Sequence, residues 1–322
     1  MTTDFPAPRM IPTNGIELAC HELGSGRPVI LLHGFPELAY SWRFQLPVLA
    51  AAGYRAIAPD LRGYGASSKP TGVQEYTIQK LLGDVTGLLD ALSLEKAIFI
   101  GHDWGSLLLW QMALLAPERM EGLIQLNIPF IPRTSIDPIE LMRERFGEDF
   151  YIVNFQDSDE ADRVFAANPE HFFRVVMRRL PIRRALFRLL PRKYRSFSFL
   201  RSLSSSRTHG SDLMPDEDLA VFIDAYRRGG FSGPINWYRN WSHNWRTTEG
   251  VEQRVRVPTL FVAADDDVLI SPRQIRAMRP HIDDLESRTI RKCGHWTQQE
   301  QPEKFNRLML AWLRRRFPPQ ES

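Results

Sequence analysis

The sequence has 322 residues, of which 43% are hydrophobic and 25% are charged, a balance typical of soluble globular proteins. The length is too great for one small domain but suits one core that carries a large insertion. No run of about 18 apolar residues occurs, which excludes a transmembrane helix. The formal net charge is +3, yet residues 171–211 hold ten arginines and Lys193 without any acidic residue, whereas acids outnumber bases elsewhere. One basic segment on an acidic body argues against a nucleic-acid-binding protein.

The first half of the chain alternates short apolar runs with helical patterns, which is typical of βα units and a mostly parallel sheet. Buried strands appear as apolar runs, and amphipathic helices appear as apolar residues spaced three and four apart. The expected strands are residues 29–32, 54–58, 97–100 and 122–126, and the expected helices are residues 41–52, 78–92 and 106–115.

This alternation stops after Pro129. From there to about Trp245 the pattern is helical, aromatic and rich in arginine, with several prolines between the helical stretches. Strand patterns return at residues 259–264 and 289–291, and an amphipathic helix is expected at residues 302–316.

These patterns predict an α/β protein in which a mostly parallel sheet flanked by helices is interrupted by a helical cap. We assign residues 1–128 and 246–322 to the core and residues 129–245 to the cap.

The basic segment, residues 171–211, falls within the expected cap. We expect its arginines to form the solvated outer face of cap helices. The alternative is that they face a membrane surface or an anionic substrate together with apolar neighbours such as Phe172, Phe173 and Leu189.

The cysteine content and the start of the chain predict a cytoplasmic protein. Cys20 and Cys293 are the only cysteines, and two in a chain of this length are typical of reduced thiols. Residues 1–20 lack the basic and apolar regions of a secretory signal. No metal-ligand spacing such as CxxC or HExxH is present, so we expect neither a metal nor a cofactor.

The segment Gly101–His102–Asp103–Trp104–Gly105 follows one expected strand and precedes a helix. Small residues on both sides of a central side chain are typical of a nucleophile elbow, a strained turn that presents this side chain to a site. A carboxylate is a nucleophile without deprotonation and suits displacement at a strained or activated sp³ carbon. Asp103 is therefore the candidate nucleophile. The alternative is an ordinary glycine-rich turn in which Asp103 caps the next helix.

Two further segments fit the same chemistry. His33–Gly34–Phe35–Pro36 follows an earlier strand, and this loop supplies one backbone N–H of the oxyanion hole in folds with a nucleophile elbow. Phe35 and Trp104 are therefore the candidate oxyanion donors. His295 follows the last strand and is the candidate base, because nucleophile, acid and base then occur in the order expected for the fold.

The acid that orients the base should follow the strand at residues 259–264. Asp265, Asp266 and Asp267 all do so, and periodicity does not choose among them. At least two of the three are expected to be solvated loop residues. Asn127 ends the preceding strand and cannot act as a carboxylate.

The sequence strongly resembles the soluble epoxide hydrolases of the α/β-hydrolase fold. The resemblance spans nearly the whole chain and is weakest around residues 157–225. The shared motifs are HGFPE at 33–37, WR at 42–43, DLRGYGxSS at 60–68, GHDWG at 101–105, GFSGPINWYRN at 230–240 and CGHWTQ at 293–298.

The resemblance implies roles for particular residues. Its D-x-V-L pattern points to Asp266 as the acid, and its cap motifs point to Tyr151 and Tyr238 as the two phenols that hold the epoxide oxygen. On the basis of this resemblance we expect a substrate pocket lined by His33, Phe35, Pro36, Trp104, Phe155 and Trp296.

The chemistry of ring opening supports the two tyrosines independently. An opening epoxide produces an alkoxide that needs hydrogen-bond donors, and a phenol with a pKa near 10 stays protonated at neutral pH. In the expected mechanism Asp103 attacks an epoxide carbon to form an ester, and water activated by His295 then hydrolyses this ester to a vicinal diol. The expected partners are a small hydrophobic epoxide and water.

Three other functions compete with this one. A haloalkane dehalogenase shares the fold and the GHDWG string but commonly has Asn where this chain has Phe35, and it lacks the paired tyrosines. A fluoroacetate-type dehalogenase would have Arg at the position of Trp104. A non-catalytic binding protein would have no need for a nucleophile, an acid and a base together.

Overall fold

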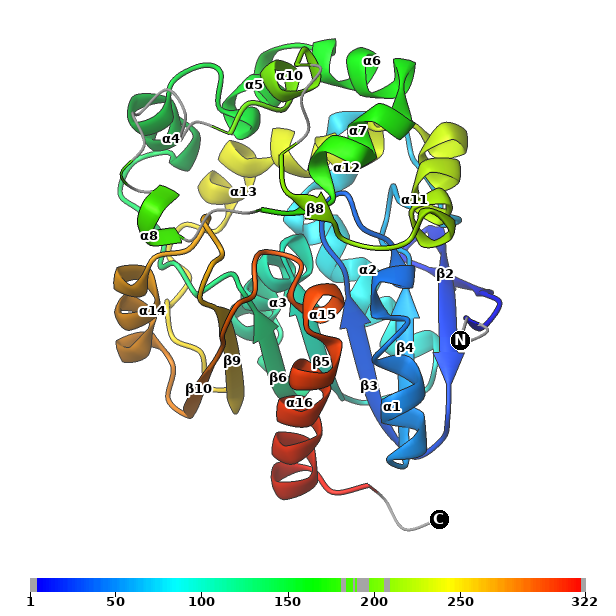
Figure 1. The fold of residues 1–322 in the computed structure, drawn as a ribbon. Coiled ribbons are helices and arrows are strands. Elements are labelled where there is room, and N and C mark those ends of the chain that lie inside the picture. The colour runs from blue at the N-terminus through cyan, green and yellow to red at the C-terminus, as the bar shows by residue number, and fades with distance from the viewer. Residues whose placement is uncertain (1–4, 181–183, 188, 190–196, 206–208, 320–322) are drawn as a thin grey trace.

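The computed structural model describes residues 5–180, 184–187, 189, 197–205 and 209–319. Figure 1 shows a central sheet with helices on both faces and a further layer of helices over one end of the sheet.

The main sheet has eight strands in the order β1-β2-β4-β3-β5-β6-β9-β10. β2 pairs antiparallel with both β1 and β4, and the other neighbours are parallel. The strands are β1 Arg9–Thr13, β2 Ile16–Leu23, β3 Arg27–Leu32, β4 Tyr54–Pro59, β5 Ala97–His102, β6 Met120–Leu126, β9 Thr259–Ala264 and β10 Leu285–Ile290.

Alternate residues of the central strands face two hydrophobic cores, as the pleat of a strand requires. In β3, Val29 and Leu31 belong to the core that also contains residues of the helices α1 and α16. Ile30 and Leu32 belong to the core that contains residues of α2 and α3, and this core continues into the helices above the sheet. The flanking helices are α1 Leu46–Ala51, α2 Ile78–Ala91, α3 Trp104–Leu115, α14 Pro272–Met278, α15 Thr297–Glu300 and α16 Pro302–Arg316, with 3-10 turns η1 Ala39–Trp42, η2 Val73–Tyr76, η3 Pro117–Arg119 and η4 Arg279–His281.

The helices above the sheet all come from the segment between β6 and β9 (Figure 1). The limits of the cap at residues 129 and 245 stay a prediction. The elements of this segment are α4 Pro138–Phe146, α5 Tyr151–Asp157, α6 Glu160–Ala167, α7 Pro169–Val176, β7 Arg178–Arg179, α8 Arg184–Phe187, α10 Phe199–Leu203, β8 Ser211–Asp212, α11 Asp216–Gly229, α12 Ser232–Arg239 and α13 Trp241–Thr247.

Three local features differ from the sequence-based expectation. The last strand, expected at residues 289–291, is β10 at Leu285–Ile290. The helix expected at residues 41–52 is divided into η1 and α1, because Pro47 lies in the first turn of α1, where its missing N–H costs nothing. The hairpin of β1 and β2 was not expected. Asn14 and Gly15 connect its strands with φ angles of 44° and 76°, the conformation that two-residue hairpin turns favour.

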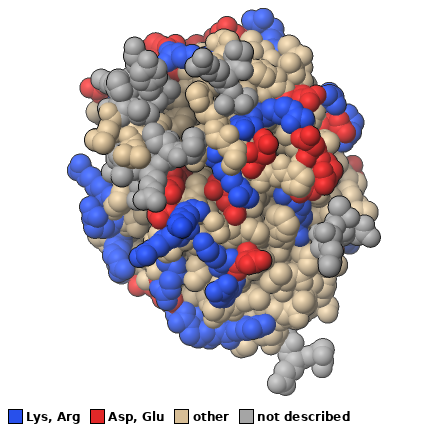
Figure 2. Space-filling model, viewed as in Figure 1, with Lys and Arg blue, Asp and Glu red and all other residues tan. Residues whose placement is uncertain are grey.

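Part of the basic segment lies outside the described residues. This part includes Lys193, Tyr194 and five of the ten arginines. Among the described arginines, Arg174 pairs with Glu170 and Asp216, and Arg178 pairs with Asp212, all acids of the same layer. Figure 2 accordingly shows red and blue side chains intermixed over α7 and α11, and a more uniformly basic face lower down, around α14 and α16. Phe172 and Phe173 are fully buried and are therefore not part of an outer surface.

Among the described residues, none of the helices has the length and apolar character needed to cross a lipid bilayer.

Candidate active site

Asp103 stands on the turn between β5 and α3, with its backbone at φ 49° and ψ −117°. A positive φ is uncommon outside glycine and stores strain that often marks functional sites. The turn is closely packed, since a Cβ atom on Gly105 would lie 2.1 Å from the carbonyl oxygen of Leu32. The Asp103 side chain makes no capping hydrogen bond to α3 and instead lines a cavity. The helix-capping interpretation of Asp103 is therefore wrong.

Both carboxylate oxygens of Asp103 have defined neighbours. The backbone N–H of Phe35 donates to Oδ1 at 2.9 Å. Oδ2 lies 3.6 Å from Nε2 of His295, so the sequence-predicted nucleophile and base are brought together. Trp104 is the first residue of α3, and its backbone N–H belongs to the group of helix N–H donors without an intrahelical acceptor. The two backbone donors predicted from sequence thus flank Asp103.

The acid beside His295 is Asp267 and not Asp266. Nδ1 of His295 lies 2.9 Å from Oδ2 of Asp267. The prediction of Asp266 is wrong by one residue. Its side chain is only half-buried, and its backbone N–H pairs with the carbonyl of Cys293, which fixes this part of the loop and leaves the next side chain to point inward.

Asp267 is 1% exposed and is held by further donors. Nδ2 of Asn127 donates to its Oδ2 at 2.6 Å, and the backbone N–H of Leu269 donates to its Oδ1 at 2.9 Å. Oδ1 of Asn127 in turn accepts from the hydroxyl of Thr297 at 2.6 Å. Asn127 thus orients the acid Asp267 through a hydrogen bond, a role that sequence reasoning missed.

The charges of the site reinforce one another. Burial alone would raise the pKa of Asp267, but the His295 charge and the hydrogen bonds from His295, Asn127 and Leu269 hold it below its ordinary value. Burial alone would lower the pKa of His295, but Asp267 and Asp103 outweigh burial and raise it well above 6.5. The imidazole therefore lies between two carboxylates that favour its protonated form.

A second buried network lies behind this group. Glu37 accepts from Nδ1 of His102 at 2.7 Å and from the side chains of Gln298 and Gln299, and the other ring nitrogen of His102 contacts the carbonyl of His295 at 2.8 Å. Burial would raise the pKa of Glu37, but His102 and other donors lower it to about 2. The network connects the loop after β3, the elbow and the loop that carries His295. Sequence reasoning assigned no role to Glu37, although it lies in the quoted HGFPE motif.

Tyr151 and Tyr238 reach the cavity from the helical layer, Tyr151 at the start of α5 and Tyr238 within α12. Their ring centroids are 5.7 Å apart. The side chain of Gln156 donates to the Tyr238 carbonyl at 3.0 Å and so ties α5 to α12. Burial and then the charge of Asp103 raise the pKa of Tyr151, and burial, Tyr151 and Asp103 raise that of Tyr238. Both phenols are therefore protonated donors at neutral pH.

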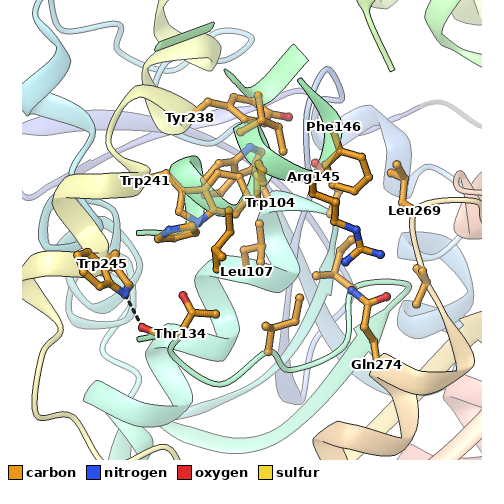
Figure 3. A pocket seen from close by; sticks show the side chains of 18 of the residues that line it. Trp104, Leu107, Thr134, Arg145, Phe146, Tyr238, Trp241, Trp245, Leu269 and Gln274 are labelled. Atoms are coloured by element: carbon orange, nitrogen blue, oxygen red, sulfur yellow. Dashed lines mark hydrogen bonds between the residues drawn. The ribbon is translucent and has the colours of Figure 1, made fainter. Parts of the chain in front are cut away.

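The cavity that contains Asp103 and both tyrosines has a volume of about 780 Å³. Figure 3 shows Trp104, Leu107 and Trp241 gathered beneath Tyr238, with Arg145 and Phe146 on the opposite side. Most of its lining in the described part of the chain is apolar. Two cationic side chains among the described residues, Arg133 and Arg145, line it as well, and the guanidinium of Arg133 stacks on the ring of Trp245 at 4.3 Å.

Of the six residues predicted to line the pocket, only Trp104 lines this cavity. His33 is fully buried, and its Nε2 accepts from the backbone N–H of Leu61. Phe35 and Phe155 pack against Tyr238 from outside the cavity, Pro36 is buried beside Phe35, and Trp296 packs against His295. Sequence reasoning missed Leu107, Trp241 and Leu269, because helices and loops that are distant in the chain bring them together only in the fold.

The profile of the α/β hydrolase fold family matches residues 27–302. The chain is 38% identical over 323 residues to epoxide hydrolase A of Mycobacterium tuberculosis (strain ATCC 25618 / H37Rv), a match that covers 96% of this chain and 97% of the relative. It is 36% identical over 301 residues to bifunctional epoxide hydrolase 2 of Sus scrofa, which covers 93% of this chain. This match spans 53% of the pig protein, about half its length.

Solved structures of epoxide hydrolases are also similar to this chain. Epoxide hydrolase A from Mycobacterium thermoresistibile superposes with a TM-score of 0.87 at 36% identity, over 98% of this chain and 100% of that chain. An epoxide hydrolase from Vigna radiata superposes with a TM-score of 0.85 at 30% identity, over 98% of this chain and 99% of that chain. The predicted α/β-hydrolase fold is confirmed.

Proposed function

This chain belongs to the epoxide hydrolase family of the α/β-hydrolase fold, and we propose that it converts small hydrophobic epoxides to vicinal diols. One observation carries the proposal: two protonated phenols, Tyr151 and Tyr238, share an apolar cavity with the carboxylate of Asp103. A nucleophile on one side and two O–H donors on the other suit a leaving group that is an oxygen atom still attached to the substrate.

In the first step, an oxygen of Asp103 attacks one epoxide carbon, and the bond between this carbon and the ring oxygen breaks. The ring oxygen takes a proton from one of the two tyrosines while the other donates a hydrogen bond. The products are an alkyl ester on Asp103 with a free β-hydroxyl group, and a phenolate. Oδ2 is the attacking oxygen of choice, because Oδ1 already accepts from the N–H of Phe35.

In the second step, His295 takes a proton from water, and the oxygen of this water attacks the ester carbonyl carbon. The N–H groups of Phe35 and Trp104 stabilise the resulting oxyanion. Collapse of the tetrahedral intermediate releases the diol and restores the Asp103 carboxylate. Return of the proton from His295 to the phenolate closes the cycle, so that the net reaction is the addition of one water molecule to the epoxide.

The helices of residues 129–245 act in this proposal as the cap that supplies both tyrosines and excludes bulk water. The location that we propose is the cytoplasm, and the two cysteines, which are buried free thiols, are compatible with it.

Haloalkane dehalogenation is the second candidate. It is favoured by the indole Nε1 of Trp104, a buried donor beside the Tyr238 hydroxyl that a halide could use. A halide also needs a second N–H donor, and Phe35 offers no side-chain N–H.

The deciding experiment is a single-turnover reaction in ¹⁸O-labelled water with aryl and alkyl epoxides, accompanied by a halide-release assay with haloalkanes. The proposal expects diol formation, with the label in the carboxylate of Asp103 after one turnover, because water attacks the ester carbonyl. Label found only in the diol would contradict the covalent ester. Halide release without diol formation would favour the dehalogenase.

A further inference from the structure

The two sides of Tyr238 differ in how they are filled. On one side lies the 780 Å³ cavity, where Trp104, Leu107 and Trp241 line the space next to Asp103. From there it extends between α4, α13 and the loop before α14, past Phe146 and Leu269 (Figure 3). A long or bulky substituent next to the reacting carbon has room on this side.

The other side of Tyr238 is filled, among the described residues, by an aromatic plug, which we define as Phe35, Phe155, Phe165, Phe172 and Phe199. The rings of Phe35 and Phe155 pack against Tyr238 with centroid distances of 5.5 and 5.2 Å. Phe199 packs against Tyr151 at 4.7 Å. None of the five plug residues lines the cavity.

The rings of the plug also pack against one another. Phe155 contacts Phe165, and Phe165 contacts Phe172 with a centroid distance of 4.5 Å. Phe155, Phe165 and Phe172 are at most 1% exposed. Rings packed at this density can move only together with their neighbours. Displacement of one ring by a substrate group therefore has a high free-energy cost.

From this asymmetry we infer that the site selects terminal epoxides, which carry their bulk on one ring carbon, over internal epoxides with chains on both ring carbons. The inference rests on the proposed function and names its substrate class. With the ring oxygen held by both tyrosines and one carbon over Asp103, the substituent of a terminal epoxide occupies the cavity. The second chain of an internal epoxide points into the plug.

The first test compares two isomers of equal size and similar hydrophobicity, 1,2-epoxyoctane and trans-4,5-epoxyoctane, with the unmodified enzyme. We expect kcat/KM to be about 10-fold or more higher for the terminal isomer, the scale at which a pocket rejects extra methylene groups. Equal values, or a preference for the internal isomer, would overturn the inference and leave the proposed function intact. If neither isomer nor styrene oxide is hydrolysed, the proposed function fails and the inference with it.

The second test removes part of the plug. Phe155→Ala and the half-buried Phe199→Ala should lower the ratio of kcat/KM for the terminal isomer to that for the internal isomer by about 10-fold. The ratio is the readout because any loosening of the tyrosines affects both isomers alike. Phe155→Leu offers a smaller change should the alanine variant fail to fold.

The matched control is Phe222→Ala. Phe222 is as buried as Phe155, and its ring contacts are with Tyr40 and Phe173, which are not part of the plug. This variant should lose stability without a change in the isomer ratio. A plug variant that leaves the ratio unchanged, or a control that shifts it as far as the plug variants do, would overturn the inference.

Discussion

Nδ1 of His295 lies 2.9 Å from Oδ2 of Asp267, while Nε2 of the same ring lies 3.6 Å from Oδ2 of Asp103. One imidazole therefore connects the carboxylate that is the proposed nucleophile with the carboxylate that orients the base. During the proposed cycle one of these charges disappears when the ester forms, whereas the other remains. The electrostatic environment of His295 thus changes between the two steps.

Replacing Asp267 with Asn should leave ester formation nearly intact and slow ester hydrolysis by about 10³- to 10⁴-fold, as loss of the orienting acid does in comparable triads. The amide cannot stabilise the imidazolium and favours the wrong tautomer. Single-turnover kinetics with mass spectrometry of the trapped ester would measure both steps. The control is Asp266→Asn, for which we expect a hydrolysis rate close to that of the parent. The assignment of Asp267 would be wrong if the two variants behaved alike.

The one-residue error at this acid shows what the sequence could and could not predict. Strand 259–264, the order of nucleophile, acid and base, and the presence of three candidate acids were all readable from local patterns. The choice among Asp265, Asp266 and Asp267 depends on contacts with Asn127 and Cys293, which are distant in the chain. No periodicity within a loop encodes such contacts.

The cavity, too, was predicted only in part from local patterns. Asp103, His295 and both tyrosines were predicted because each stands in a motif. The structure brings Asp103 and both tyrosines around one cavity and places His295 3.6 Å from Asp103. The lining was mostly missed, because Leu107 and Trp241 look like ordinary apolar positions of helices. Phe35 and Phe155 were expected at the pocket and were found in the plug, since sequence proximity to a site does not tell on which side of Tyr238 a ring will pack.

The pH dependence of ester hydrolysis should reflect the change around His295. In the free enzyme, burial lowers the pKa of His295, but Asp267 and Asp103 outweigh burial and raise it. Esterification neutralises Asp103 and removes one of these two charges, so the pKa of His295 should be lower in the ester than in the free enzyme. Only the deprotonated ring accepts a proton from water, so the hydrolysis rate should rise with pH up to this lower pKa and then level off.

Two measurements check this expectation: single-turnover ester hydrolysis against pH, and NMR titration of His295 in the free enzyme. The kinetic midpoint should lie below the titration midpoint. A kinetic midpoint equal to or above that of the free enzyme would show that Asp103 does not act on His295 as proposed.

Glu37 should make folding stability depend on pH in the acid range. Its pKa is lowered from 4.5 to about 2, so its stabilising contribution is complete above about pH 5 and is lost as the pH falls towards 2. The lowered pKa corresponds to roughly 3 kcal/mol in the free energy of unfolding. Glu37→Gln should be less stable than the parent at neutral pH, and the difference should shrink as the pH falls. Urea unfolding at several pH values measures this, with the exposed Glu118→Gln as a control that should follow the parent. A difference in the free energy of unfolding between parent and Glu37→Gln that stayed constant at all pH values would contradict the link between the Glu37 pKa and stability.

The two cap tyrosines give the sharpest test of the epoxide chemistry. Tyr151→Phe and Tyr238→Phe each remove one donor to the developing alkoxide and keep the ring, so packing should change little. Loss of one such donor typically costs about 3 kcal/mol of transition-state stabilisation, or roughly a hundredfold in rate. Each single variant should therefore form the ester slowly, and the double variant should scarcely form it while remaining folded.

The measurement is the single-turnover rate of ester formation, with Tyr226→Phe as the matched control. The Tyr226 ring is buried outside the cavity, and its hydroxyl has no hydrogen-bond partner in the described part of the chain. Removing an unpaired buried hydroxyl should cost neither rate nor stability. If Tyr238→Phe formed the ester as fast as the parent, the phenol would not be supporting the epoxide oxygen. If the control slowed as much as Tyr238→Phe, the loss would be a packing effect, because Tyr226 does not line the cavity that contains Asp103.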